Sequence, residues 1–378
     1  MLTIGASRAV TMSTSGRRYG ASAIAVVASR DEAKLATGRH CGPLGAERAF
    51  VPAVTPGVLR EQGGEIPMSI FPAKILLAID GSRGAELAGR AAAELAARTG
   101  SELHVVHVFG IMPWYPVFPE DTGPDEPEEP PAEEDRGWIS ERRARELLDE
   151  KAEKLGSLGG AVAEAHLREG GPAQEIVGLA EELGAGLIVV GSRGLGGIRR
   201  ALLGNVSDLV VRHAHCPVMV VRGLAGGKAF AFPARILLAT DASEESRLAA
   251  TTAADVAQRT GSELHVVHVG ELRSVIHPER HGYHARYEEL REGAQRQLEK
   301  QVEEIVSTGG TVAKTHLRMG RPDEEIVLLG EETGAGLIVM GSRGLGGIRR
   351  ALVVSVSDSV VRHAHCPVMV VRNAEGKT

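Results

Sequence analysis

A glycine-rich segment with the composition of a phosphate-binding loop occurs twice in the chain. The first copy begins Gly191-Ser192-Arg193-Gly194 and, after nine further residues, reaches Gly204-Asn205-Val206-Ser207. The second begins Gly341-Ser342-Arg343-Gly344 and, after the same interval, reaches Val354-Ser355-Val356-Ser357. Each copy lies between a short apolar run and a helix-like stretch. Because glycine lets the backbone approach an anion and the free N–H groups of a helix start point toward it, both segments are candidate phosphate sites.

The elements that must position these loops follow one order in each half of the chain. Apolar runs bounded by glycine and proline predict strands at 74–79, 102–108, 161–167, 187–190 and 217–221. Helical periodicity and capping residues predict helices at 85–98, 140–155, 172–183 and 205–213. Strands that alternate with helices in this way predict an α/β fold with a parallel, doubly wound, Rossmann-like sheet.

The second half of the chain repeats the first. Residues 232–239 mirror 71–78, and the segment Gly261–Val269 repeats Gly100–Val108. The offset between the copies is 161 residues there and 150 at the glycine segments, so the first copy is 11 residues longer. A proline-rich, acidic segment around residues 110–138 accounts for the difference. We therefore expect two tandem domains, 71–222 and 232–372, joined by a linker at 223–231.

Charge and cysteine content limit the classes of function. The net charge of -6 argues against a nucleic-acid or anionic-membrane binder, and no apolar run approaches the roughly 20 residues of a membrane helix. The three cysteines, Cys41, Cys216 and Cys366, form no disulfide framework, so a reducing cytoplasm is expected. Export is the alternative, because Arg17-Arg18 precedes a mildly apolar stretch at 21–28.

Two segments carry no clear periodicity. Residues 1–70 are expected to be a disordered extension, unless Met68 is the true start of the protein. The acidic stretch 119–135 is expected to be solvated, with a role in binding a protein partner as the alternative. The sequence names no such partner.

Each half resembles a universal stress protein domain. The ATP-binding members of that family carry Gly-x-x-Gly, nine residues, and then Gly followed by Ser or Thr. Here the motif arrives with its neighbours: an apolar strand before it, Asp80 at the end of the first strand, and a Cys-Pro-Val strand after it. The resemblance covers residues 71–222 and 232–372 and leaves the N-terminal extension outside.

The resemblance implies ATP or AMP as the ligand, with Mg²⁺ at its phosphates. In a doubly wound sheet of order 3-2-1-4-5, ligands bind at the carboxyl ends of strands 1 and 4, where Asp80 and Gly191 lie. On the adenine and ribose side the family pattern places Ala78, Ile79, Asp80 and Val108. Around the ribose and phosphates it places Gly191, Arg193, Gly194, Gly204, Asn205, Val206 and Ser207. Ser207 and the N–H groups near Asn205 are expected to donate to phosphate oxygens.

Two departures from the family motif predict unequal domains. Asn205 stands where the family has Ser or Thr, and we interpret it as an N-cap that can also donate a hydrogen bond. Val354 replaces the third glycine of the second copy, where a β-branched side chain adds bulk and disfavours a positive φ. Weaker binding is therefore assigned to the second set: Asp241, Val269, Gly341, Gly344, Ser355 and Ser357.

Two further groups of residues have structural alternatives. Asp80 and Asp241 can cap the turn that follows their strands instead of binding a ligand. His213-x-His215-Cys216 and the matching His363-x-His365-Cys366 have the composition of a metal site, but a fourth ligand is missing from each. We expect a helix C-terminus that favours histidine and leads into a buried cysteine, and no metal.

The function expected is that of a nucleotide-dependent regulator of a stress response. No catalytic base or nucleophile is placed on the loop, so we expect no enzyme, although slow ATP hydrolysis or autophosphorylation stays open. The alternative is an interaction module that needs no nucleotide.

The fifth strands of the two domains, Val218–Val221 and Val368–Val371, are apolar edges that must be covered. We expect them to pair within one chain; a homodimer through the same edge stays open. Antiparallel pairing would place Cys216 and Cys366 at opposite ends of the ribbon, without a disulfide.

Overall fold

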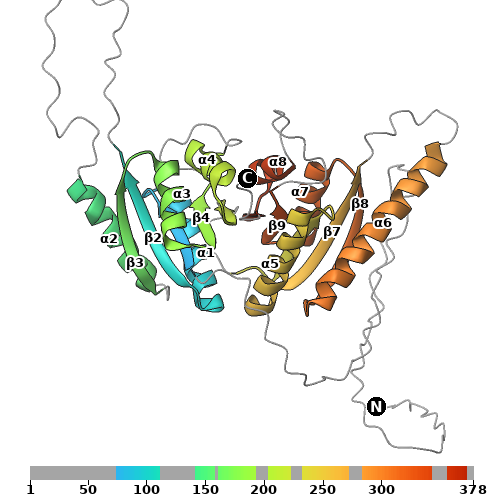
Figure 1. Ribbon diagram of the computed structural model, residues 1–378, viewed down its shortest axis with the longest axis horizontal. Helices are drawn as coiled ribbons and strands as arrows, with labels where there is room; N and C mark the ends of the chain where they lie inside the picture. The colour runs from blue at the N-terminus through green and yellow to red at the C-terminus, as the bar shows by residue number, and fades with distance from the viewer. Residues whose placement is uncertain are drawn as a thin grey trace, which may run out of the picture. The chain divides into compact units, whose positions relative to one another are not determined.

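The computed structural model describes seven stretches of the chain: residues 74–110, 141–157, 161–192, 203–222, 232–271, 283–342 and 356–372. The predicted extension at 1–70, the linker at 223–231 and the acidic stretch 119–135 lie outside these residues. The described parts of the two halves have the same order of elements, which Figure 1 colours from blue to green and from yellow to red.

Strands and helices alternate through both halves. The first half contains β1 (Lys74–Ile79), α1 (Arg83–Thr99), β2 (Glu102–Phe109), α2 (Glu141–Ser157), β3 (Val162–Glu169), α3 (Pro172–Leu183), β4 (Leu187–Gly191), α4 (Asn205–His213) and β5 (Val218–Val221). The second contains β6 (Arg235–Thr240), α5 (Glu244–Thr260), β7 (Glu263–Glu271), α6 (Tyr283–Ser307), β8 (Lys314–Gly320), α7 (Pro322–Thr333), β9 (Leu337–Gly341), α8 (Val356–His363) and β10 (Val368–Val371). The expected strands and helices of the first half are all present.

All ten strands form one sheet, in the order β3-β2-β1-β4-β5-β10-β9-β6-β7-β8. Within each half the pairs are parallel, and the order is the predicted 3-2-1-4-5. The α/β fold with two doubly wound, Rossmann-like units is therefore confirmed. In this order the carboxyl ends of β1 and β4 lie side by side, and this edge carries the glycine segment.

Small side chains let the helices lie close to the sheet. One face is covered by a core that includes Leu77 of β1 and the alanines of α1, and the other by a core that includes Ile188 of β4 and Ile176 of α3. Helix α1 ends where predicted, because Gly100 adopts the left-handed conformation at φ 71°. With aromatic residues at only 3% of the sequence, these cores are built from Ala, Val, Leu and Ile.

The two domains pair through their fifth strands, as predicted. β5 and β10 are antiparallel, with Met219 opposite Met369 and Val218 opposite Val370. The pairing covers two apolar edges that would otherwise be exposed. The thiols of Cys216 and Cys366 are free in this structure.

Arginines reinforce the junction from both sides in a nearly two-fold pattern. Arg222 Nη1 donates to the Ala364 carbonyl at 2.8 Å, and Arg372 Nη1 donates to the Arg212 carbonyl at 2.8 Å. These carbonyls lie at the C-terminal ends of α8 and α4, where a cation is favoured by the helix dipole. Arg362 also reaches across to the Asp208 carboxylate at 2.8 Å. The contact between the domains is thus built from specific polar bonds as well as from strand pairing.

Within the described residues no helix combines the length and the apolar character that a membrane span requires.

Candidate functional site

Two local hydrogen bonds fix the turn that follows β1. Asp80 Oδ1 accepts a hydrogen bond from the Ser82 N–H at 2.9 Å, and Ser82 Oγ accepts from the Ala85 N–H at 3.2 Å. Ser82 is therefore the N-cap of α1, and Asp80 stabilises the turn before it. A carboxylate has two oxygens, so this bond leaves Asp80 capacity for a further donor.

The first glycine of the loop is required by helix packing. A Cβ on Gly191 would lie 2.6 Å from the backbone carbon of Gly84 and 2.9 Å from the Ala85 nitrogen. Real side chains do not approach a backbone so closely, so only glycine lets the end of β4 lie against the first turn of α1. This contact brings α1 to the start of the loop.

Hydrogen bonds join the C-terminal end of the loop to its N-terminal end. The Gly204 N–H donates to the Ser192 carbonyl at 2.9 Å, and Ser207 Oγ donates to the Gly191 carbonyl at 2.7 Å. Ser207 is buried, so in this structure its hydroxyl closes the loop, whereas we expected it to donate to a phosphate. Asn205 and Val206 at the start of α4 are exposed, and no side chain caps this helix.

Two details of the loop differ from the sequence-based expectation. Gly204 is the N-cap of α4 and has φ −66° and ψ 147°, an extended conformation open to any residue. The argument that valine is excluded at the matching position by a positive φ is therefore wrong for this loop, and only the argument from bulk is left. Asn205 is the first helical residue and not the N-cap, because the chain enters the helix one residue earlier than the motif suggested.

The residues assigned to the adenine side lie on two faces of the sheet. Ala78 and Val108 pack against the core under α3 and α4. The Ile79 side chain belongs to the opposite core, under α1 and α2. Its side chain is therefore on the other face of the sheet from those of Ala78 and Val108. The structure thus brings Ala78, Asp80, Val108 and Gly191 to the carboxyl edge of adjacent strands.

Four predicted residues lie outside the described part of the chain: Arg193, Gly194, Gly344 and Ser355. Val354 lies there as well, so the structure does not describe the position where the two motifs differ.

The second domain has the same aspartate turn after its first strand, but a carboxylate contacts the start of its glycine segment. Asp241 Oδ1 accepts from the Ser243 N–H at 3.0 Å, as Asp80 does in the first half. Ser342 Oγ donates to Glu245 Oε2 at 2.9 Å, and Ser357 Oγ donates to the Ser342 carbonyl at 3.1 Å. Gly341 lies against the backbone of Glu245 as Gly191 lies against Gly84, and Val269 is the counterpart of Val108. The Glu245 carboxylate therefore lies at the start of the second glycine segment.

The first two residues of α1 and α5 differ in charge, although the fourth residues, Glu86 and Arg247, differ in the opposite sense. With the offset of 161 residues, Arg83-Gly84 in the first domain corresponds to Glu244-Glu245 in the second. The formal charge is +1 in the first pair and −2 in the second, a difference of three charges. Arg83 and Glu244 are both exposed, so each is accessible to a ligand in solution. Sequence reasoning missed this asymmetry, although an alignment of the two halves reveals it.

The sequence matches one family model twice. The model of the universal stress protein family matches residues 73–222 and residues 234–372, which together span more than half of the chain. The chain belongs to the universal stress protein family. The two universal stress protein domains are the two halves of the ten-stranded sheet.

Universal stress proteins that match this chain over about 300 residues occur among its relatives. One from Mycolicibacterium smegmatis is 31% identical over 300 residues, which cover 79% of this chain and 96% of that protein. One from Mycobacterium tuberculosis is 30% identical over 303 residues, covering 79% and 97% of the two chains. The crystal structure of a universal stress protein from Archaeoglobus fulgidus is 25% identical, covers 80% of this chain and 98% of that one, and has a TM-score of 0.55.

The first universal stress protein domain also has a small pocket between α1 and α2. Ile79, Gly89 and Leu155 form its apolar wall, and Lys151 and Lys154 lie at its rim. Both ammonium groups contact the Glu86 carboxylate, at 3.7 and 3.1 Å. The hydrogen bond from Lys154 is the main cause that lowers the pKa of Glu86.

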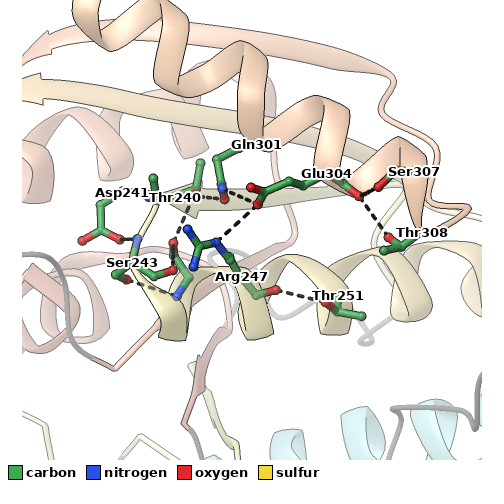
Figure 2. A network of polar contacts seen from close by, with 11 residues as sticks. Thr240, Asp241, Ser243, Arg247, Thr251, Gln301, Glu304, Ser307 and Thr308 are labelled. Carbon is green, nitrogen blue, oxygen red and sulfur yellow. Dashed lines mark hydrogen bonds and ion pairs between the residues drawn. The ribbon is translucent and has the colours of Figure 1, made fainter.

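The second universal stress protein domain has a polar network at the corresponding place, which Figure 2 shows. Thr240 stands where the first domain has Ile79, and its hydroxyl donates to Gln301 Oε1 at 2.8 Å. Gln301 donates to Glu304 at 2.8 Å, and Arg247 pairs with Glu304 at 3.4 Å. Arg247 and Glu304 correspond to Glu86 and Lys154, so the ion pair is reversed between the domains.

The histidine and cysteine pairs do not form a metal cluster in the described residues. His215 contacts the Glu181 carboxylate, and His365 lies 3.6 Å from that of Glu331. Burial raises the pKa of the Cys216 and Cys366 thiols to about 12. Thiols with so high a pKa stay protonated at neutral pH when no metal is bound.

Proposed function

We propose that this protein is a nucleotide-binding regulator whose first domain holds ATP or AMP and whose second domain has lost the site. The proposal rests mainly on the charge at these two helix starts. Arg83 precedes Gly84, which lies against Gly191, whereas Glu244 precedes Glu245, which lies against Gly341 and accepts a hydrogen bond from Ser342. A phosphate group is attracted to the first edge and repelled by the second. The spaced glycine motif, which resembles that of ATP-binding universal stress proteins, supports the same assignment.

The residues at the first edge fit a nucleotide. The uncapped N–H groups at the start of α4 and the Arg83 guanidinium are donors for phosphate oxygens. Asp80 is an acceptor for a ribose hydroxyl or an amino group, and Ala78 and Val108 offer apolar surface beside it. Mg²⁺ would accompany the phosphates of ATP and neutralise their charge. The chain's own contribution is to bind and orient the nucleotide.

The role that we propose is regulatory, and we expect it to be exercised in a reducing compartment such as the cytoplasm. Slow hydrolysis of bound ATP and an interaction role without nucleotide are the two alternatives. The enzyme alternative predicts that the protein releases inorganic phosphate from ATP. The interaction alternative predicts that the purified protein carries no nucleotide.

The experiment is to denature freshly purified protein and identify the released nucleotide by chromatography. The proposal predicts up to one adenine nucleotide per chain, and a marked loss of it from a variant with Arg83→Glu and Gly84→Glu. Release of inorganic phosphate from added ATP by the wild type would favour the enzyme instead. Protein that is free of nucleotide and does not take up added ATP would contradict the proposal.

A further inference from the structure

Two histidines and a glutamate converge on the outer part of the first domain. His104 of β2 and His166 of β3 stack with their ring centroids 5.4 Å apart, and His104 Nδ1 lies 3.1 Å from His166 Nε2. Glu164 precedes His166 by two residues on the same strand, and its Oε2 lies 3.7 Å from His166 Nε2. One ligand atom from each residue lies within 4.8 Å of the other two.

These distances fit a small divalent cation. A tetrahedral zinc ion with bonds of about 2.0–2.1 Å holds its ligand atoms about 3.3 Å apart. The separations of 3.1 and 3.7 Å lie on either side of that value, and all three ligand atoms lie within 4.8 Å of one another, so side-chain shifts would bring them to a common ion. Two imidazoles and one carboxylate form a common donor set for Zn²⁺ and leave a fourth position for water.

The surroundings of the other ring nitrogen of His104 are compatible with a cation on Nδ1. His104 is 5% exposed, and its Nε2 is buried without a hydrogen-bond partner among the described residues. The carboxylate oxygen Oε2 of Glu102 lies 3.5 Å from this nitrogen. A cation on Nδ1 would fix the tautomer with a proton on Nε2, which then donates to Glu102. Carboxylates behind metal-bound histidines hold such rings in this way.

The second domain repeats the histidines but reverses the charge beside them. His265 Nδ1 and His316 Nε2 lie 3.3 Å apart, as in the first domain. The register of the strands places Glu164 opposite His104 and Lys314 opposite His265. An ammonium group at this position removes one ligand and repels a cation.

We infer that His104, Glu164 and His166 form a binding site for one divalent cation of the zinc type, present in the first domain and absent from the second. The cation connects β2 to the edge strand β3. Its ligands lie along these two strands, on residues other than those that form the glycine loop. The site is therefore independent of nucleotide binding.

The test uses the full-length protein after treatment with a chelator and dialysis. It is titrated with Zn²⁺ in a calorimeter and with Co²⁺ in an absorption spectrometer. We expect one Zn²⁺ per chain, a tetrahedral Co²⁺ spectrum, and an affinity at least thirtyfold lower in Glu164→Lys. Glu164 is exposed, so this variant is expected to fold. The matched variant Lys314→Glu is expected to bind a second Zn²⁺ per chain.

Two results would overturn the inference. One is a wild-type protein that binds no more Zn²⁺ than Glu164→Lys, which would place the bound metal elsewhere or nowhere. The other is a Lys314→Glu protein that folds, as judged by circular dichroism, and gains no second ion.

Discussion

The two domains share a fold but differ in charge at three matched places. At the helix start beside the glycine loop, Arg83-Gly84 of the first domain corresponds to Glu244-Glu245 of the second. Between the helices, the ion pair of Glu86 with Lys154 corresponds to the reversed pair of Arg247 with Glu304. On the outer strands, Glu164 is replaced by Lys314. The strands and their apolar residues are nearly the same in both halves. The comparison indicates that the scaffold tolerates charge reversal at these three places while the cores are kept.

The largest expected effect concerns nucleotide affinity at the first edge. Changing Arg83→Glu together with Gly84→Glu gives the first domain the charges of the second. Loss of a charge-assisted hydrogen bond, at about 1.5–3 kcal/mol, together with repulsion is expected to weaken ATP binding about a hundredfold. Calorimetric titration measures the change. The control is Arg142→Glu on the exposed side of α2, which is expected to leave the affinity unchanged within about twofold.

The next effect concerns the two glycines at the strand ends. Gly191→Ala would place a Cβ 2.6 Å from backbone, whereas the nearest backbone atom to one on Gly341 lies at 3.0 Å. We expect Gly191→Ala to lower the free energy of unfolding by about 2–3 kcal/mol and Gly341→Ala by about 1 kcal/mol. Chemical denaturation of both variants compares them. Equal losses would show that the two helix contacts are equally tight in solution.

A third comparison tests the polar network of the second domain. Thr240→Val leaves the buried Gln301 Oε1 without its donor, which is expected to cost about 1–3 kcal/mol. Ile79→Val at the matching position removes only one methylene group and is expected to cost about 0.5–1.5 kcal/mol. Denaturation curves of the two variants give both values. A smaller loss for Thr240→Val than for Ile79→Val would mean that the network contributes little.

The smallest expected effect is on the pH dependence of stability. Burial lowers the pKa of His316 to about 4, with a further decrease from the charge of His265 and then of Lys314, whereas Glu164 opposes the decrease at His166. Between pH 6.5 and pH 4 the unfolded chain binds a proton at His316 that the folded chain does not, so stability falls as the pH falls. Below pH 4 both states are protonated and this contribution is constant.

His316→Gln is therefore expected to reduce the loss of thermal stability between pH 7 and pH 4.5 by a few degrees. Thermal unfolding of the variant and the wild type at the two pH values measures it. An unchanged loss would show that other groups dominate the acid response.

Much of the fold could be predicted from the sequence because the signals are local. Apolar runs, Gly100 as a helix end and Pro172 at a helix start each determine an element without distant contacts. The pairing of β5 with β10 was also predictable, since two apolar edge strands need a cover.

The site was predicted less completely, because its chemistry depends on distant contacts. The need for glycine at 191 comes from Gly84, and the bond of Ser207 goes to a residue 16 positions away. The histidines at 104 and 166 meet only because β2 and β3 are neighbours. Alignment of the two halves would have revealed the exchanges Arg83 to Glu244 and Glu164 to Lys314, but not which ligand they affect.

The central claim is that only one domain of each chain binds nucleotide tightly. Titration calorimetry of the nucleotide-free wild-type protein with ATP and Mg²⁺ tests it most directly, because the stoichiometry counts the sites. The account predicts one tight site per chain, which Gly204→Val removes. Two equal sites per chain, or a tight site that persists in Gly204→Val, would contradict it.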